Sequence, residues 1–207
     1  FLSDLAYRAL RYAISVNEAN AKMFRIVACP TAGACGILPG VMQAVGEVYE
    51  CDEEAYVNGF LAAAGVGNVV TNQACVAGAV GGCQAEVGTA AAMASACAVA
   101  MMGGTTEEVV TAMTLCMKNV LGLVCDPVAG LVEVPCVKRN GIYAVHALAS
   151  AEMAMAGLRS RIPADEVIGA MDSIGRALPE ALRETSEGGL AKTKTGVDIT
   201  NRLAHQK

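Results

Sequence analysis

The sequence predicts an all-α protein, a compact single-domain helical bundle whose irregular loops carry three of its nine cysteines. Apolar residues make up 54% of the 207 residues but aromatic residues only 4%, so the core must be built from Ala, Val, Leu and Met. Ala and Met favour helices, and small alanines let helices pack closely. Apolar residues recur at helical spacing, whereas the alternation typical of strands is scarce. The length suits one domain, residues 1–207.

Three helices are expected in the first third of the chain. The spacing of apolar residues from Ser3 to Val27 predicts the first. The second is expected from Pro39 to about Glu50, because proline suits a first helical turn. The acidic run Asp52–Glu54 opens the third, since acids stabilise the positive end of a helix dipole. This helix is expected to fray near Gly65–Gly67.

Four more helices are expected further along, at residues 84–102, 105–121, 139–157 and 163–178. The first of these is rich in alanine. The second opens with a capping box in which Thr105 pairs with Glu108. Glycines and prolines mark residues 122–135 as a loop. After Gly188–Gly189 the helical pattern is expected to give way to a polar tail.

The composition excludes several classes of protein. The net charge is −5, and no cluster of basic residues exists to neutralise nucleic-acid phosphates. The most apolar run, Ala90–Met102, is shorter than the roughly 20 residues that cross a bilayer, so a membrane span is not expected. The cysteine count is odd and most cysteines lie in apolar helical stretches, which favours a reducing cytoplasm over a secreted disulfide scaffold.

Three cysteines stand outside the interiors of the expected helices. Cys83 follows two glycines at the start of a helix, Cys125 lies in the loop, and Cys136 follows a proline shortly before the next helix. A helix N-terminus lowers the pKa of a thiol and favours the thiolate, which is the form that binds metal. A three-cysteine metal site is therefore one interpretation of these residues.

The residues alone leave a second interpretation open. Cys125 and Cys136 are not spaced as in common zinc or ferredoxin motifs, so buried or reactive thiols without a metal remain an alternative. Cys97 and Cys116 are expected in the core, among Ala, Met and Leu. The roles of Cys29 and Cys35, which flank a loop, stay open.

Four segments carry a family resemblance. They are PTAGACGILPG at residues 30–40, GCQAEVG at 82–88, LGLVCDPVAGLVEVPCVKRN at 121–140 and ETSEGGLAKT at 184–193. In order and in content they resemble the catalytic alpha chain of the bacterial iron–sulfur L-serine dehydratases. The two cysteine-bearing segments are the most specific.

The resemblance implies a mainly helical catalytic domain that binds a [4Fe–4S] cluster through Cys83, Cys125 and Cys136. With three thiolates, one iron keeps an open position and serves as a Lewis acid that helps the serine hydroxyl to leave. The implied activity is that of an L-serine ammonia-lyase, which forms pyruvate and ammonia in amino-acid degradation and gluconeogenesis. Pyridoxal phosphate is not expected, because no lysine lies in a recognisable site for it.

The resemblance also points to residues that bind substrate. Thr31, Ala32 and Gly33 lie in a Gly/Pro loop that could present backbone N–H groups to an anion, although an ordinary turn is the alternative. Arg139 and Asn140 could clamp a carboxylate beside Cys136, or could simply begin a solvated helix.

The catalytic base is not identified by the sequence. Glu86 and Glu133 are candidates, because each is an acid in apolar surroundings near a proposed ligand, and burial would raise its pKa. Structural hydrogen bonding is the alternative for both. His146 is expected to be a core histidine with a satisfied hydrogen bond.

The resemblance implies a β subunit or β domain, whose Ser-Ser-His-Thr motif is absent from this sequence. The chain is therefore expected to be a fragment of the whole enzyme, with L-serine as substrate and an oligomeric assembly. Two other functions stay open: an L-cysteine desulfidase-like iron–sulfur lyase, and a non-catalytic helical module with a zinc site made of three cysteines.

Overall fold

A computed structural model describes residues 1–205, so Gln206 and Lys207, the end of the predicted domain, lie outside the described residues. The α-helices are α1 (Asp4–Ala21), α2 (Ile37–Val48), α3 (Glu53–Gln73), α4 (Gly78–Gly81), α5 (Cys83–Met101), α6 (Thr106–Lys118), α7 (Cys136–Met155), α8 (Ala164–Ala177) and α9 (Lys194–Ala204). Short 3-10 turns are η1 (Val128–Gly130), η2 (Glu180–Leu182) and η3 (Gly189–Lys192). Between residues 1 and 205 no strand forms, which confirms the all-α class.

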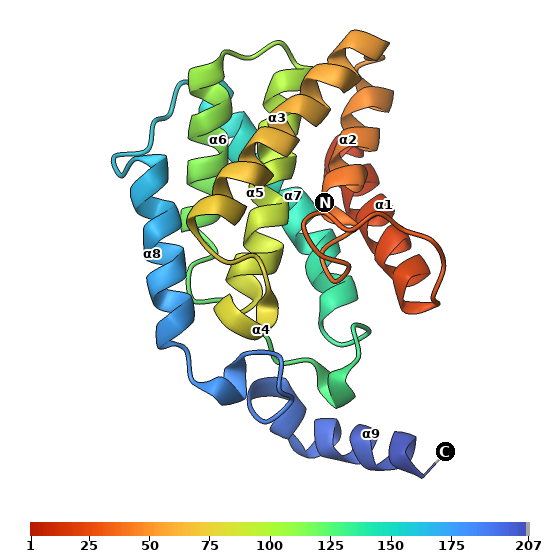
Figure 1. Cartoon of the computed structure of the whole chain (residues 1–207). Helices are drawn as coiled ribbons and strands as arrows, with labels where there is room; N and C mark the ends of the chain where they lie inside the picture. Colours follow the sequence, from red (N-terminus) through yellow and green to blue (C-terminus); the bar gives the residue numbers. More distant parts are fainter. Residues whose placement is uncertain (206–207) are drawn as a thin grey trace.

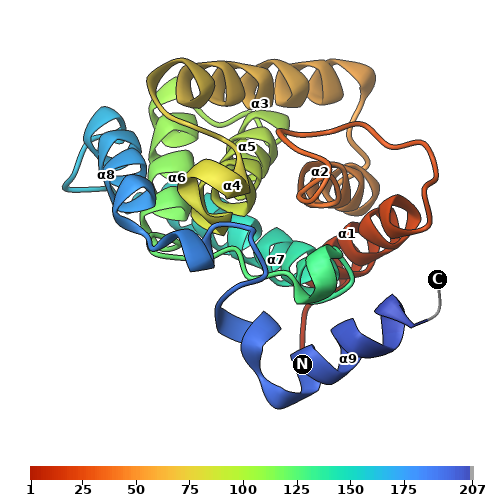
Figure 2. The same cartoon turned by 60° about the horizontal axis from the view of Figure 1, so that its bottom comes forward.

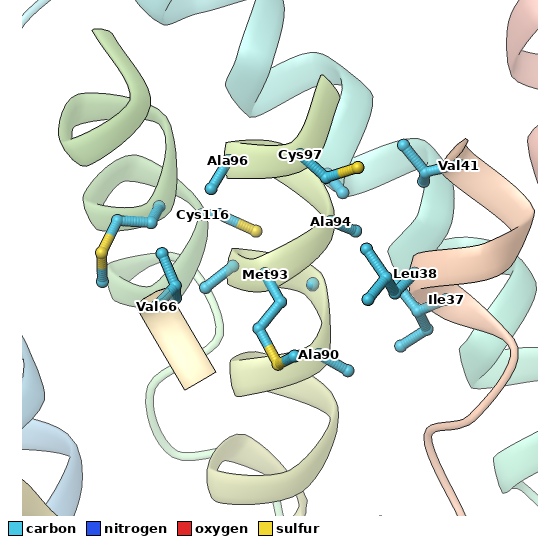
Figure 3. Close-up of a cluster of buried hydrophobic side chains, with 14 of the residues drawn as sticks. Ile37, Leu38, Val41, Val66, Ala90, Met93, Ala94, Ala96, Cys97 and Cys116 are labelled. Carbon is cyan, nitrogen blue, oxygen red and sulfur yellow. The ribbon is translucent and has the colours of Figure 1, made fainter. Parts of the chain in front are cut away.

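Helix α5 is the centre of the bundle, surrounded by α2, α3, α6 and α7 (Figures 1 and 2). Every residue of α5 except Ala100 is buried, as expected for a helix that is apolar on all sides. Figure 3 shows Ala90, Ala94 and Met93 of this helix among side chains of α2 and α3. Its alanines let these neighbours approach closely and exclude water.

Cys97 and Cys116 lie in this core and are fully buried, as predicted (Figure 3). His146 of α7 lies 2.9 Å, through Nε2, from the carbonyl oxygen of Cys116. The histidine thus has the hydrogen bond that was expected of it. Over residues 1–205, every helix is too short or too polar to traverse a lipid bilayer.

The structure corrects two predicted helix ends. Helix α1 stops at Ala21 instead of Val27, because Met23 adopts a left-handed backbone (φ 61°) and residues 24–28 form no regular secondary structure. Helix α3 continues through Gly65–Gly67 to Gln73 instead of fraying there. Gly67 faces Met93 of α5, and a Cβ would stand 3.1 Å from the methionine methyl group. This glycine is therefore a packing residue between two helices.

Two helices were absent from the sequence prediction. The single-turn helix α4 precedes α5, and α9 replaces the expected polar tail. Thr193 caps α9 by accepting the N–H of Gly196, and the helix packs against η1 and η3 at the lower edge of the bundle (Figure 1). Because α9 packs against short turns instead of the helical core, its apolar side chains Val197 and Leu203 remain exposed.

Removal of the α6 cap has a small predictable cost. Thr105 accepts the N–H of Glu108, and the Glu108 carboxylate accepts the N–H of Thr105 at 2.7 Å, which completes the capping box. Thr105→Ala is expected to lower the free energy of unfolding by about 1 kcal/mol, or roughly 2–4 °C in Tm for a chain of this length. Calorimetry measures the shift. Thr106→Ala, one residue into the helix, is the control and should leave Tm unchanged or slightly raised.

Candidate active site

A cavity of about 280 Å³ is lined by residues of α4, α5, α7 and η1. Figure 1 shows that α5 and α7 begin at the same end of the bundle, near α4. The loop between α1 and α2 and the segment that follows η2 complete the walls of the cavity. The lining residues are Thr31, Ala32, Gly33, Ala77, Gly78, Glu86, Cys125, Pro127, Gly130, Leu131, Val132, Cys136 and Glu184. Five of the residues singled out in the sequence therefore share one cavity with Glu86.

The three candidate ligand cysteines converge on this end of the fold. Cys83 is the first residue of α5 and Cys136 the first residue of α7, three residues earlier than the predicted helix start. Cys125 precedes η1, where its N–H donates to Leu182 O (2.9 Å) and its carbonyl accepts the N–H of Glu184 (2.8 Å). Ligand atoms of Cys83, Glu86 and Cys125 all lie within 4.8 Å of one another.

The three thiols differ in their electrostatic surroundings. A hydrogen bond from Cys125 and the nearby Arg139 guanidinium lower the pKa of Cys83. That same hydrogen bond to Cys83, together with burial, raises the pKa of Cys125. Burial raises the pKa of Cys136 to about 12, so at this position desolvation outweighs the effect expected from the helix N-terminus. Cys83 is thus the thiol of the three that most readily becomes a thiolate.

Arg139 forms hydrogen bonds with the residues on either side of Cys125. Its guanidinium donates to the carbonyl of Val124 (3.0 Å) and to Asp126 Oδ1 (2.9 Å), and Asp126 Oδ2 accepts the N–H of Leu190 (2.8 Å). Arg139 does not line the cavity. The prediction that Arg139 binds a substrate carboxylate is therefore not supported by its contacts. Arg139 instead fixes the loop around Cys125 and places a positive charge near Cys83.

Asn140 also has partners within the protein. It is fully buried; its Nδ2 donates to Gly33 O (2.8 Å) and Cys136 O (2.9 Å), and its Oδ1 accepts the N–H of Gly36 (2.9 Å). Both amide hydrogens are used, so the side chain has none left for a ligand. Asn140 instead joins the start of α7 to the loop at residues 30–36.

Two further asparagines hold the same loop. Asn17 donates to Gly33 O (2.9 Å) and Asn20 to Ala32 O (3.0 Å), both from α1. In a trans peptide the N–H points opposite to the carbonyl, so the N–H groups of Gly33 and Ala34 face away from these asparagines. Neither N–H has an acceptor among residues 1–205. Sequence reasoning did not single out Asn17 or Asn20, and it proposed Asn140 as a substrate ligand instead of a support for this loop.

Glu86 faces the loop from the first turn of α5. Thr31 Oγ1 donates a short hydrogen bond to Glu86 Oε1, and the residue is only 7% exposed. Burial raises the pKa of this carboxyl. A Cβ at Gly33 would collide with the Glu86 carboxylate, and one at Gly78 would stand 3.1 Å from both Glu86 Oε2 and Cys125 Sγ. The two glycines thus leave space around the carboxylate.

Two other acids lie differently from what the sequence suggested. Glu133 is exposed and outside the cavity lining, so the burial that made it a candidate base is absent. Glu184, which the sequence reasoning did not single out, lines the cavity. It belongs to the ETSEGG segment, but only the pairing of that segment with Cys125 brings it to the site.

The chain is similar in sequence to a protein family and to several named proteins. A family model described as serine dehydratase alpha chain matches residues 2–191. The probable L-serine dehydratase alpha chain of Latilactobacillus sakei is 53% identical over 203 residues, which are 98% of this chain and 97% of its own length. The probable alpha chain of Bacillus subtilis (strain 168) is 52% identical over 195 residues (94% and 65%). L-serine dehydratase 1 of Escherichia coli (strain K12) is 42% identical over 182 residues (87% and 40%).

Proposed function

The chain belongs to the serine dehydratase alpha-chain family, and from this premise we propose that it dehydrates and deaminates L-serine to pyruvate and ammonia. The observation that carries the proposal is a cavity lined by Cys125, Cys136 and a loop with free backbone N–H groups, with the thiol of Cys83 within 4.8 Å of that of Cys125. The chain spans 97% of the length of one relative but 65% and 40% of two others, so the activity of the whole enzyme is part of this proposal.

The donor set suits an iron–sulfur cluster held by Cys83, Cys125 and Cys136. Thiolates are the usual ligands of such clusters. Cys83 already has a lowered pKa, and Gly78 leaves a space beside Cys125 that any side chain would fill. When bound, a [4Fe–4S] cluster with three protein thiolates supplies an iron with an open position that acts as a Lewis acid on the serine hydroxyl.

The loop at residues 31–34 provides the place for the substrate carboxylate. The N–H groups of Gly33 and Ala34 are free, and the three asparagines fix their direction through the opposite carbonyls. Successive backbone N–H groups held in this way form a concave site for anions. Thr31 and Ala32 line the same cavity, which supports the proposal that they contact the substrate.

Glu86 is the chain's own group for moving the Cα proton. Its Oε1 is held by Thr31, which leaves Oε2 directed towards Gly78 and Cys125 inside the cavity. A positioned carboxylate with raised pKa can accept a proton and return it to the intermediate. Loss of the Cα proton and of the hydroxyl gives aminoacrylate, which becomes an imine and hydrolyses.

The remaining parts of the proposal concern partners and compartment. Relatives named as alpha chains imply a β chain or β domain, and we propose that this chain acts with such a partner in an oligomeric assembly. The nine cysteines are free thiols, which suits an iron–sulfur enzyme in the reducing cytoplasm.

Metal content and turnover test the proposal together. After anaerobic reconstitution, the chain is expected to hold about four iron and four sulfide ions. With its β partner it should release pyruvate from L-serine faster than from L-cysteine. Zinc without sulfide would contradict the cluster and favour a zinc module with three cysteine ligands. Faster release of sulfide from cysteine would favour a desulfidase.

A further inference from the structure

Glu184 presents an unpartnered carboxylate to the candidate cavity. Among residues 1–205, no hydrogen bond or ion pair is made by its side-chain oxygens. A Cβ on Gly78 would lie 3.3 Å from Glu184 Oε2, 3.1 Å from Glu86 Oε2 and 3.1 Å from Cys125 Sγ. The two carboxylates and the thiol therefore surround one point at the cavity wall.

The backbone holds Glu184 in this position from two sides. Its N–H donates to the carbonyl of Cys125 at 2.8 Å, although its own φ of 65° lies in the left-handed region. Ser186, also left-handed, donates to Pro127 O (2.6 Å) and accepts the N–H of Gly130 (3.1 Å). Non-glycine residues in this region cost free energy, so the surrounding contacts must impose the conformation.

The charge of the cavity indicates what Glu184 binds. Its lining contains two carboxylates and no Lys, Arg or His. Glu86 is deep in the cavity and already bonded to Thr31, whereas Glu184 is exposed at the mouth. A ligand with its carboxylate on the N–H groups of Gly33 and Ala34 would need a cationic group to match this acidic wall.

We propose that Glu184 binds the α-ammonium group of the substrate and thereby restricts the cavity to α-amino acids. This inference rests on the proposed function, in which L-serine is the substrate. The ammonium donates a charge-assisted hydrogen bond to Glu184, while the carboxylate is held on the opposite loop. Glu184 is then the residue that separates serine from hydroxy acids that lack an amino group.

Two ligands that differ in the ammonium group test the assignment. L-alanine keeps the ammonium and carboxylate of serine, whereas 3-hydroxypropionate lacks the ammonium. In the reconstituted full chain with its β partner, Glu184→Gln should raise KM for L-serine and Kd for L-alanine by about 10–100-fold, with kcat changing less. Kd for 3-hydroxypropionate should stay within about threefold of wild type. Glu187→Gln, an exposed acid outside the cavity on the same loop, is the control and should change neither.

The outcomes separate this inference from the proposed function. Equal weakening of both ligands, unchanged affinity for L-alanine, or no binding of L-alanine by wild type would overturn the role of Glu184. Selective loss of L-alanine affinity in a chain that does not turn over serine would support that role and refute the dehydratase activity. Serine turnover in wild type with no selective effect of Glu184→Gln would leave the dehydratase activity standing and remove this inference.

Discussion

Replacing Cys83, Cys125 or Cys136 individually by serine is expected to reduce bound iron to background and serine turnover by about 10³-fold or more. In the proposed mechanism the Lewis acid would contribute several kcal/mol to leaving-group departure, and a hydroxyl is a poor ligand for a cluster iron. The three thiols share one end of the bundle, and two of them open helices α5 and α7. Loss of any one would leave the proposed cluster with only two protein thiolates, too few to retain it.

Iron and acid-labile sulfide per folded chain measure this effect after anaerobic reconstitution. Cys97→Ser is the matched control, because Cys97 is equally buried but lies on α5 among alanines, where its Sγ contacts Met101 Sδ at 3.7 Å. It should keep its iron and lose only some stability. Similar iron loss from Cys97→Ser, or full iron retention in a Cys83, Cys125 or Cys136 variant, would refute the ligand set.

The order and type of most helices could be predicted from the sequence, since apolar spacing, proline and the Thr105 capping box are local signals. The end of α3 could not, because the glycines at residues 65–67 resemble a helix stop. Gly67 packs against Met93 of α5, a contact between distant segments that the local sequence does not reveal. Helix α9 was missed for a related reason: it packs on short turns instead of the core.

The site residues also fall into those that local motifs predict and those whose role depends on contacts between distant segments. The cysteines and the Gly/Pro loop belong to local motifs, so sequence could propose them as neighbours. Arg139 and Asn140 were proposed as substrate ligands, but their hydrogen bonds run to Asp126 and to Gly33 and Gly36. Glu184 was missed because its place depends on the pairing of residues 182–184 with Cys125. Contacts between distant segments decided each of these roles.

Asn140→Ala should therefore damage both stability and catalysis. The substitution removes three hydrogen bonds and leaves the buried N–H of Gly36 without an acceptor. We expect the free energy of unfolding to fall by about 2–4 kcal/mol, since an orphaned buried donor costs more than the bond itself gained. Asn140→Asp should be similarly harmful, because a carboxylate oxygen would then face the carbonyls of Gly33 and Cys136.

The catalytic part of this effect follows from the position of the loop. Without Asn140, the N–H groups of Gly33 and Ala34 are no longer fixed relative to Cys136, and a displacement of about 1 Å can cost roughly 10²-fold in turnover. Thermal unfolding by circular dichroism gives the stability, and kcat per intact cluster well below Tm gives the catalytic loss. Asn72→Ala is the control, because Asn72 is exposed and bonds only the carbonyl of Asn68 in its own helix. If Asn140→Ala lowered Tm but left kcat and KM unchanged, the loop would be held by Asn17 and Asn20 alone, and Asn140 would act only in folding.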